Sequence, residues 1–531
     1  MNNRPRDVVL STAWLRQCCS ALFAGVSRSA SAGASAGALA IAAGLLAACG
    51  ASSGPTASGI GGTGFVARGE ISAISGGATQ AVDSITVNGS AYALAGASVS
   101  VDDSAASADD LRLGMVVTVR GSGDLAEEVV YDDEVEGPIV NLQIAADGDS
   151  ATFDVFGIAV SASASGTHFD ADSSGFGLAA LADKQMVEVS GFRDNGALQA
   201  TRIELKSASF SAGAEVEVKG TVSGLGASSF TLAGNPGLTI SFDAGTELDE
   251  LPGGTLSDGD FVEVRGTLNA TMDQLDADEI EGEDGALGGE DGAQSSVEGL
   301  VGGVQQNTGG NPELSAFTVA GQLVDASGAG TEFRPASLAQ SLADGMRVEV
   351  EGELQGGVLV ADEVKLKSEA RVAALLDEID ESAGTLTLTF APGLSIVVDY
   401  GAATEFDEPL SLLTVDISHV EVEGAVDAAS GRLQAARVRD AEQNGSEPVS
   451  IRARVEAFTA PGIGGLGSGS ITLLGVDFTA GGAVFEAENG DPIDSTTFWS
   501  QLRVGDEIEL EDELAGNLQG DGSADKVAFE D

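Results

Sequence analysis

The stretch Leu342–Gly352, LADGMRVEVEG, alternates valine with glutamate and ends on a glycine. Nearly the same stretch occurs as LSDGDFVEVRG at Leu256–Gly266 and as LRLGMVVTVRG at Leu111–Gly121. We call the shared pattern L-x-x-G-x-x-V-x-V-x-G the anchor. Because successive side chains of a β-strand point to opposite faces, the valines share one face and the glutamates the other. The anchor therefore predicts a half-buried strand that recurs along the chain.

Three weaker copies of the anchor extend the series. They are Leu181–Gly191 with Lys184 in place of the first glycine, Thr414–Gly424 with Ile417 there, and Leu502–Asp512 with Ile508 and Leu510 as the alternating pair. An A-x-x-[IV] pattern follows each anchor, at Ala126/Val129, Ala200/Ile203, Ala277/Ile280, Ala361/Val364, Ala435/Val438 and Ala524/Val527. A T-x-[FL] run precedes four anchors, at Thr167/Phe169, Thr246/Leu248, Thr331/Phe333 and Thr404/Phe406. Six occurrences in a fixed order indicate internal repeats.

The third repeat gives the clearest strand pattern. It predicts strands at Glu215–Ser223, Ser229–Ala233, Leu238–Asp243, Phe261–Leu268 and Gln274–Glu281, with a turn or short helical piece around Leu251–Asp258. Five strands with a small connector after the third resemble the partly open Greek-key barrel of the OB-fold. A row of small open β-sandwiches fits the same strands and stays the alternative.

The chain of 531 residues is too long for one hydrophobic core, so the repeats divide it into several domains. We expect an all-β tandem array of about six small five-stranded OB-like barrels, which we call units 1 to 6. Their predicted ranges are 64–133, 134–210, 215–281, 295–368, 370–442 and 449–531, with an acidic, Gly-rich linker at 282–294.

The N-terminal residues indicate export to the bacterial envelope. Arginines precede a short apolar run, Ala34–Ala48, which leads into LLAAC at Leu45–Cys49. This stretch matches a lipobox and predicts a lipoprotein signal peptide at 1–48, lipidation of Cys49 and a flexible tether at 49–63. An ordinary signal peptide with an incidental cysteine is the alternative. Gly50 rather than aspartate after the cysteine favours the outer membrane, with the lipid anchor as the contact to the membrane.

The first unit resembles the bacterial family known as domain of unknown function 5666. The residues that carry the resemblance are Ile85–Gly89 (ITVNG), Ala97–Asp102 (ASVSVD) and Asp110–Gly121, together with the lipobox and the following GIGGTG. The resemblance implies envelope lipoproteins built of repeated small β-barrels. It implies no known activity and provides no catalytic residue.

The composition argues against several classes of function. A formal net charge of −58 repels nucleic acid, and the chain has no row of aromatic residues on which bases could stack. His168 lies inside a T-x-F run and is expected at an exposed strand end, and His419 at a strand start is expected to pack or to face solvent. Neither has a partner at a catalytic spacing, so we expect no enzyme and no cofactor.

Calcium binding is better supported by the composition than catalysis is, since hard cations bind clustered carboxylates. The candidates are Asp273, Asp276, Asp278 and Glu281, although no known calcium-loop pattern is present and a solvated strand edge explains them as well.

We therefore expect a lipid-anchored binding, scaffold or spacer protein whose partner is an envelope protein or glycan. Capture of calcium or of a small envelope ligand is the alternative function. Each anchor is expected to pair within its own unit, so that the units fold as separate beads and repel one another at low salt.

Overall fold

The computed structural model describes residues 64–530 except 77–81, 147, 171–175, 195–196, 252–253, 284–286, 289–290, 307–313, 369, 428–429, 442–447, 463–467, 488–491, 503 and 515–517. The helical elements of these residues are α1 (Leu338–Ser341), α2 (Ser495–Gln501) and the short 3-10 turns η1 (Ala108–Asp110), η2 (Leu178–Ala180) and η4 (Leu410–Leu412), and Gly254 also has 3-10 conformation. The all-β prediction is confirmed. Neither α-helix of the described chain has the length and apolar character needed to cross a bilayer.

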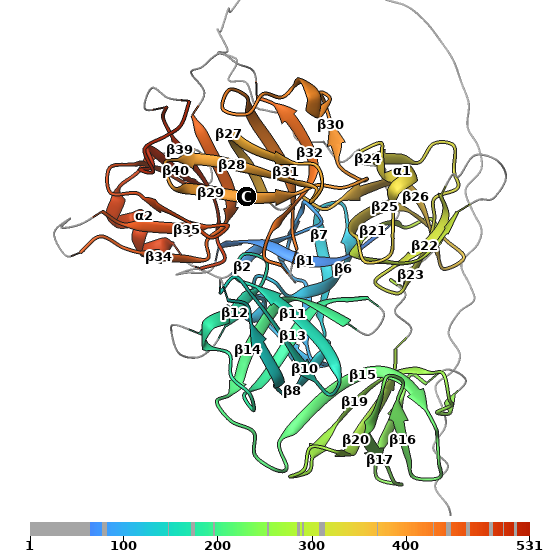
Figure 1. The fold of residues 1–531 in the computed structure, drawn as a ribbon. Helices are drawn as coiled ribbons and strands as arrows, with labels where there is room; N and C mark the ends of the chain where they lie inside the picture. The colour runs from blue at the N-terminus through green and yellow to red at the C-terminus, as the bar shows by residue number, and fades with distance from the viewer. Residues whose placement is uncertain are drawn as a thin grey trace, which may run out of the picture. The chain divides into compact units, whose positions relative to one another are not determined.

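Unit 3 shows the closed barrel clearly (Figure 1). Its strands are β15 (Glu215–Ser223), β16 (Ser229–Leu232), β17 (Asn235–Ser241), β18 (Glu247–Asp249), β19 (Phe261–Leu268) and β20 (Gln274–Gly282). Ladders run from β15 through β16, β17, β20 and β19 back to β15, with only β17–β20 parallel. The predicted first and fourth strands are confirmed at both ends. The short β18, which adds to β20 in parallel, was not among the five predicted strands.

Units 1, 4 and 5 close in the same order. Unit 1 consists of β1 (Phe65–Gly76), β2 (Val82–Val87), β3 (Ser90–Ala93), β4 (Ser98–Val101), β5 (Ser104–Ala106), β6 (Val116–Ser122) and β7 (Leu125–Tyr131). Unit 4 consists of β21 (Gln294–Gln306), β22 (Leu314–Val319), β23 (Gln322–Asp325), β24 (Glu332–Arg334), β25 (Arg347–Gln355) and β26 (Val358–Leu366). Unit 5 consists of β27 (Ala370–Asp380), β28 (Thr385–Ala391), β29 (Leu394–Asp399), β30 (Glu405–Phe406), β31 (His419–Val426) and β32 (Leu433–Asp440).

Units 2 and 6 vary this order by dividing their first strand. Unit 2 consists of β8 (Val135–Pro138), β9 (Val140–Ile144), β10 (Ser150–Val155), β11 (Ile158–Ser163), β12 (His168–Asp170), β13 (Met186–Asp194) and β14 (Ala197–Ser207). Unit 6 consists of β33 (Val449–Arg454), β34 (Ala457–Thr459), β35 (Ser470–Leu473), β36 (Val476–Thr479), β37 (Val484–Glu486), β38 (Pro492–Ile493), β39 (Glu507–Asp512) and β40 (Lys526–Phe529). In both units the first half of the divided strand pairs with the anchor strand and the second half with the next hairpin.

The last glycine of the anchor has a steric reason. Gly266 lies at a β-bulge opposite Ala277, where a Cβ atom would come within 2.2 Å of the Asp276 carbonyl oxygen. The same approach to a carbonyl oxygen, at 2.0–2.1 Å, occurs at Gly121, Gly191, Gly352 and Gly424. Only glycine fits so close to a neighbouring backbone. The glycine of the anchor and the alanine of A-x-x-[IV] are thus two sides of one bulge.

The T-x-[FL] threonine also contacts this alanine. The Thr246 hydroxyl donates a hydrogen bond to the Ala277 carbonyl oxygen at 2.8 Å. Equivalent bonds join Thr167 to Ala200, Thr331 to Ala361 and Thr404 to Ala435. In unit 3 this hydrogen bond holds the short strand β18 against β20, the last strand of the same barrel. The T-x-[FL] run, the anchor and the A-x-x-[IV] pattern therefore follow one another in a fixed order because they form one local structure.

Each anchor strand pairs with the last strand of its own unit, as predicted, but the prediction that the units are therefore separate beads is wrong. A parallel ladder joins β1 to β21, and antiparallel ladders join β8 to β15 and β27 to β33. One buried apolar cluster contains side chains of units 2 and 3, and another contains side chains of units 5 and 6. In the linker, Leu287 is only 1% exposed and packs with the apolar core of unit 4. Separate beads would leave these strand edges unpaired, and unpaired edges favour aggregation.

Candidate functional site at the junctions between barrels

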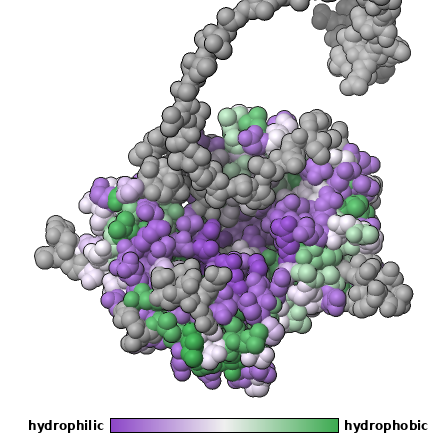
Figure 2. All heavy atoms as spheres, turned by 90° about the horizontal axis from the view of Figure 1, so that it is seen from above, coloured by the Kyte–Doolittle hydropathy of each residue, from purple (hydrophilic) through white to green (hydrophobic). Residues whose placement is uncertain are grey.

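Hydrophilic residues cover much of the face seen in Figure 2, and the net charge of −58 means that many of the hydrophilic residues in this chain are acidic. Some of the charged residues are nevertheless buried, and several of these lie where one unit contacts another. Buried charges are unfavourable unless they are paired, so their partners determine what each junction can do. The described residues contain three such places, formed around Glu70, around Lys219 and around Glu136.

Glu70 on β1 is 1% exposed and lies between three units. Its Oε2 is 2.5 Å from Nη2 of Arg347 on β25, and its Oε1 is 2.7 Å from Nη2 of Arg454 on β33. One carboxylate of unit 1 therefore pairs with arginines of units 4 and 6. This residue is part of the strand that opens the first barrel, and its charge is satisfied only by the other units.

Arg347 reaches a second buried carboxylate, Glu298 on β21, which is fully buried. Arg347 Nε donates to Glu298 Oε1 at 2.8 Å, and Lys367 Nζ donates to Oε2 at 3.2 Å. Burial opposes the charge of Glu298, but the two cations outweigh burial and lower the pKa of this carboxyl to about 2. Glu298 is therefore a permanent anion at neutral pH.

His168 on β12 packs against the same junction. Its ring is 6% exposed, and Nε2 lies 3.8 Å from Glu70 Oε1. Burial, followed by repulsion from Arg454 and Arg202, holds the pKa of His168 well below its usual value, so the ring is neutral. A Cβ on Gly505 would meet this ring at 2.3 Å. The prediction of an exposed strand-end histidine is wrong, because units 1 and 6 cover this strand end.

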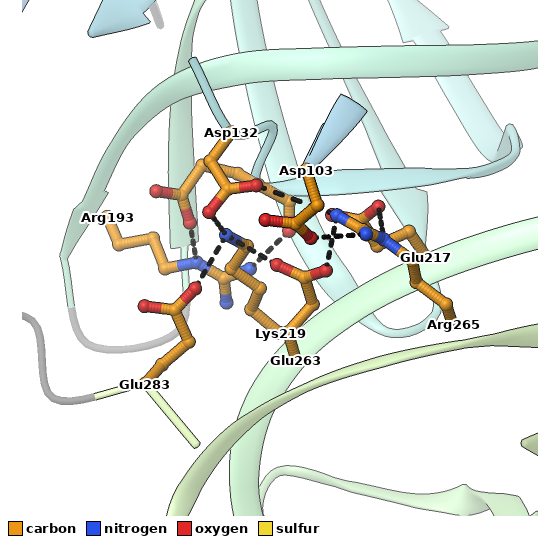
Figure 3. Close-up of polar contacts among 9 residues, drawn as sticks. Asp103, Asp132, Arg193, Glu217, Lys219, Glu263, Arg265 and Glu283 are labelled. Atoms are coloured by element: carbon orange, nitrogen blue, oxygen red, sulfur yellow. Dashed lines mark hydrogen bonds and ion pairs between the residues drawn. The ribbon is translucent and has the colours of Figure 1, made fainter. Parts of the chain in front are cut away.

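Lys219 on β15 forms the centre of the second junction (Figure 3). Its Nζ is 2.9 Å from Asp132, 2.8 Å from Glu263 and 3.0 Å from Glu283. Asp132 belongs to the segment between units 1 and 2, whereas Glu263 and Glu283 belong to unit 3 and its exit. A single buried ammonium group thus neutralises carboxylates from both sides of the junction.

Arg265 on β19 lies next to this lysine (Figure 3). It donates to Glu217 at 2.8 Å, pairs with Glu263 at 2.7 Å and reaches Asp103 of unit 1. Arg193 of unit 2, labelled in the same view, lies nearby. Its guanidinium group pairs with Glu134. Cations of units 2 and 3 therefore hold the segment that leaves unit 1.

The third junction is a row of four glutamates on four neighbouring strands. The ladder register places Glu204 of β14 beside Glu188 of β13, Glu188 beside Glu136 of β8, and Glu136 beside Glu217 of β15. Like charges directly opposite each other destabilise a sheet. The equivalent row between units 5 and 6 mixes signs, because Glu423, Arg371, Arg452 and Glu509 follow one another there. The glutamate row is thus a feature of the unit 2–3 junction.

Asp133 extends this row into the core. It is 1% exposed, and Asp133, Glu136 and Glu188 each offer a carboxylate oxygen within 4.8 Å of the others. Burial, together with Glu217 and Glu188, raises the pKa of Asp133 well above its usual value. Burial outweighs the favourable charge of Lys206 and raises the pKa of Glu136 to about 7. These carboxyls therefore resist ionisation, because the nearby cations do not offset their burial and mutual repulsion.

A cavity of about 310 Å³ borders the row on the side of unit 1. Asp102, Glu188, Glu204 and Lys206 line it together with Asp110, Arg112 and Asp170. Burial raises the pKa of Asp102 to about 7, and Glu188 and Glu217 add to this effect. The cavity is polar and roomy enough for several water molecules or a small hydrated ion.

The residues predicted as a calcium site are not gathered into one. Asp276 and Asp278 are exposed on β20, and Asp273 lies in the preceding turn, where Thr271 and Asn269 donate to its carboxylate. Glu281 is half-buried on the same strand. None of the four belongs to a group of three close carboxylates among the described residues.

Of the other predicted positions, His419 begins β31 and is half-buried, with Nε2 2.5 Å from the Leu518 carbonyl oxygen. Cys49, the signal peptide and the tether lie outside the described residues.

Comparison with known families gives one result. A family model described as domain of unknown function DUF5666 matches residues 68–131, 136–204, 219–281, 301–365 and 373–439. These matches correspond to units 1 to 5. Comparison with curated proteins found no match.

Proposed function

This chain belongs to the DUF5666 family, and on that premise we propose that it is a lipid-anchored scaffold of the bacterial cell envelope. Its barrels hold binding surfaces for an envelope protein or glycan in a fixed relation to one another. Cys49 carries the lipid, and the outer membrane is the proposed location. No catalytic step is part of this proposal.

The contacts between barrels are the observation that favours a scaffold over an extensible spacer. Three ladders cross unit boundaries, and the buried ion pairs of Glu70 connect units 1, 4 and 6. A spacer that lengthens by repulsion needs units that separate freely. Units that share ladders and buried apolar clusters separate only when these hydrogen bonds and apolar contacts are lost.

Anchoring is tested by Cys49→Ser in cells supplied with labelled palmitate. We expect an unprocessed precursor without label, because the lipid is attached to this thiol and cleavage follows. Cys18→Ser is the matched control and should keep both label and cleavage. A Cys49→Ser protein that is still labelled would contradict the lipid anchor.

The scaffold role is tested by crosslinking in intact cells. We expect the full chain to crosslink to the same envelope partner from two different units, since a scaffold presents several fixed surfaces. Crosslinks only to cytoplasmic proteins would contradict the proposal.

A further inference from the structure

The glutamate row lacks cations at its centre. Lys206 Nζ lies 2.7 Å from Glu188 and 3.9 Å from Glu204, and Arg265 pairs with Glu217 at the far end. Within the described part of the chain, Asp133 and Glu136 have no lysine, arginine or histidine nitrogen within ion-pair distance. Two carboxylates at the centre of the junction are thus without a neutralising partner.

Asp133 is the clearest example of a carboxylate at this junction without a cation partner in the part of the chain that the structure describes. It is 1% exposed, and its Oδ1 has no hydrogen-bond partner among the described residues. Glu217 is 7% exposed and lies within hydrogen-bond distance of the Asp133 carboxyl, and its Oε1 likewise has no N–H or O–H donor among the described residues. A buried oxygen without a donor is a costly arrangement, and in native proteins a bound ion or an ordered water commonly explains it.

The spacing of the oxygens fits a particular class of ion. Asp133, Glu136 and Glu188 offer oxygens that all lie within 4.8 Å of one another. Calcium binds oxygen ligands at about 2.3–2.6 Å, so two ligands on opposite sides of the ion are separated by roughly twice that distance. Magnesium demands an almost regular octahedron and keeps several water ligands, whereas calcium accepts irregular sets of carboxylates such as this one.

We propose that Asp133, Glu136 and Glu188 bind a calcium ion that braces the junction of units 1, 2 and 3. Asp133 lies in the segment between β7 and β8, Glu136 on β8 and Glu188 on β13, and β8 also pairs with β15 of unit 3. The ion neutralises Asp133 and Glu136, which pair with no cation among the described residues, and it shares Glu188 with Lys206. The adjacent cavity leaves room for water ligands. This site is separate from the predicted residues on β20, and it does not depend on the scaffold role.

Tyr131 provides a direct probe of the site. It is fully buried, and its hydroxyl donates to Glu188 Oε1 at 2.7 Å. A terbium ion is a luminescent substitute for calcium that a nearby tyrosine sensitises. Terbium added to the chelator-treated full chain should therefore emit under tyrosine excitation. Tyr131→Phe should remove the emission while Tyr92→Phe keeps it, and calcium should displace terbium better than magnesium does.

Ligand variants complete the test. Asp133→Asn with Glu188→Gln should weaken calcium binding by about ten-fold or more, measured by calorimetry, because two charged ligands are lost. The half-buried Glu136→Gln is the milder variant and should weaken binding if the double variant does not fold. Asp273→Asn with Asp276→Asn is the matched control and should bind calcium as the original chain does. Equal affinity in the ligand and control variants, emission that survives Tyr131→Phe, or equal displacement by magnesium would overturn the proposal.

Discussion

Replacement of Glu70 by glutamine tests the junction of units 1, 4 and 6. The side chain is 1% exposed, and its carboxylate pairs with Arg347 at 2.5 Å and with Arg454 at 2.7 Å. Glutamine keeps the size but removes the charge, so two arginines that are only 11% and 9% exposed lose their common anion. Breaking a buried pair by removing one partner costs about 3–5 kcal/mol. Arg347 keeps Glu298 as a partner, so we expect the lower part of that range.

Denaturant unfolding of the original chain and of Glu70→Gln gives the difference in the free energy of unfolding. The control is Glu128→Gln, which removes the exposed pair between Arg120 and Glu128, where the two side chains are 39% and 46% exposed. Exposed pairs contribute about 0–1 kcal/mol, so the control should change little. We expect the first transition to move to lower denaturant in Glu70→Gln, since units 1, 4 and 6 lose a shared contact. Equal effects of the two substitutions would refute the reasoning that Glu70 joins the units.

Two further predictions concern the repeat and its pH dependence. Gly266→Ala should destabilise unit 3 by about 2 kcal/mol or more in the same denaturation assay, because its Cβ would meet a backbone oxygen at 2.2 Å. Gly401→Ala, where a Cβ meets nothing within 4 Å, should be nearly neutral, and equal losses would contradict the bulge. Burial, then repulsion from Asp149, raises the pKa of Glu456 to about 7. Since a raised acid pKa stabilises the protonated native state, this contribution is present below the unfolded pKa and is lost as pH rises to about 7. Between about pH 5 and pH 8, the free energy of unfolding should therefore fall less in Glu456→Gln than in the original chain, by roughly 1–2 kcal/mol. Identical pH profiles of the two proteins would contradict the raised pKa of Glu456.

The strands within a unit could be predicted from the sequence because their information is local. The alternation Val262-Glu263-Val264 sets a period of two, and the structure gives β19 the predicted bounds. The bulge glycine and the threonine hydrogen bond repeat in several units, so they left a visible pattern. The sequence pattern did not show why glycine is needed at Gly266. The carbonyl oxygen that Gly266 approaches belongs to Asp276 on the neighbouring strand β20.

The junctions could not be predicted, because their partners lie far apart in the sequence. Glu188 and Glu217 occupy the polar positions of alternating strands, where sequence reasoning expects solvent. Both are buried because β8 pairs on one side with β13 and on the other with β15. The excess of acidic residues on β20 led to the calcium prediction there instead, although the Asp276 and Asp278 side chains on that strand are exposed. A charged residue at a polar strand position therefore gives no sign of whether another barrel covers it.

The central claim is that ladders and buried ion pairs hold the barrels in fixed relation, and small-angle scattering at different salt concentrations tests it most directly. Soluble protein beginning at Gly64 should be measured at about 20 mM and about 1 M salt, where the screening length falls from about 20 Å to about 3 Å. The shared ladders β1–β21, β8–β15 and β27–β33 predict a radius of gyration that does not change between these conditions. A radius of gyration that grows as salt is lowered would show that the acidic units separate freely, and would contradict the account.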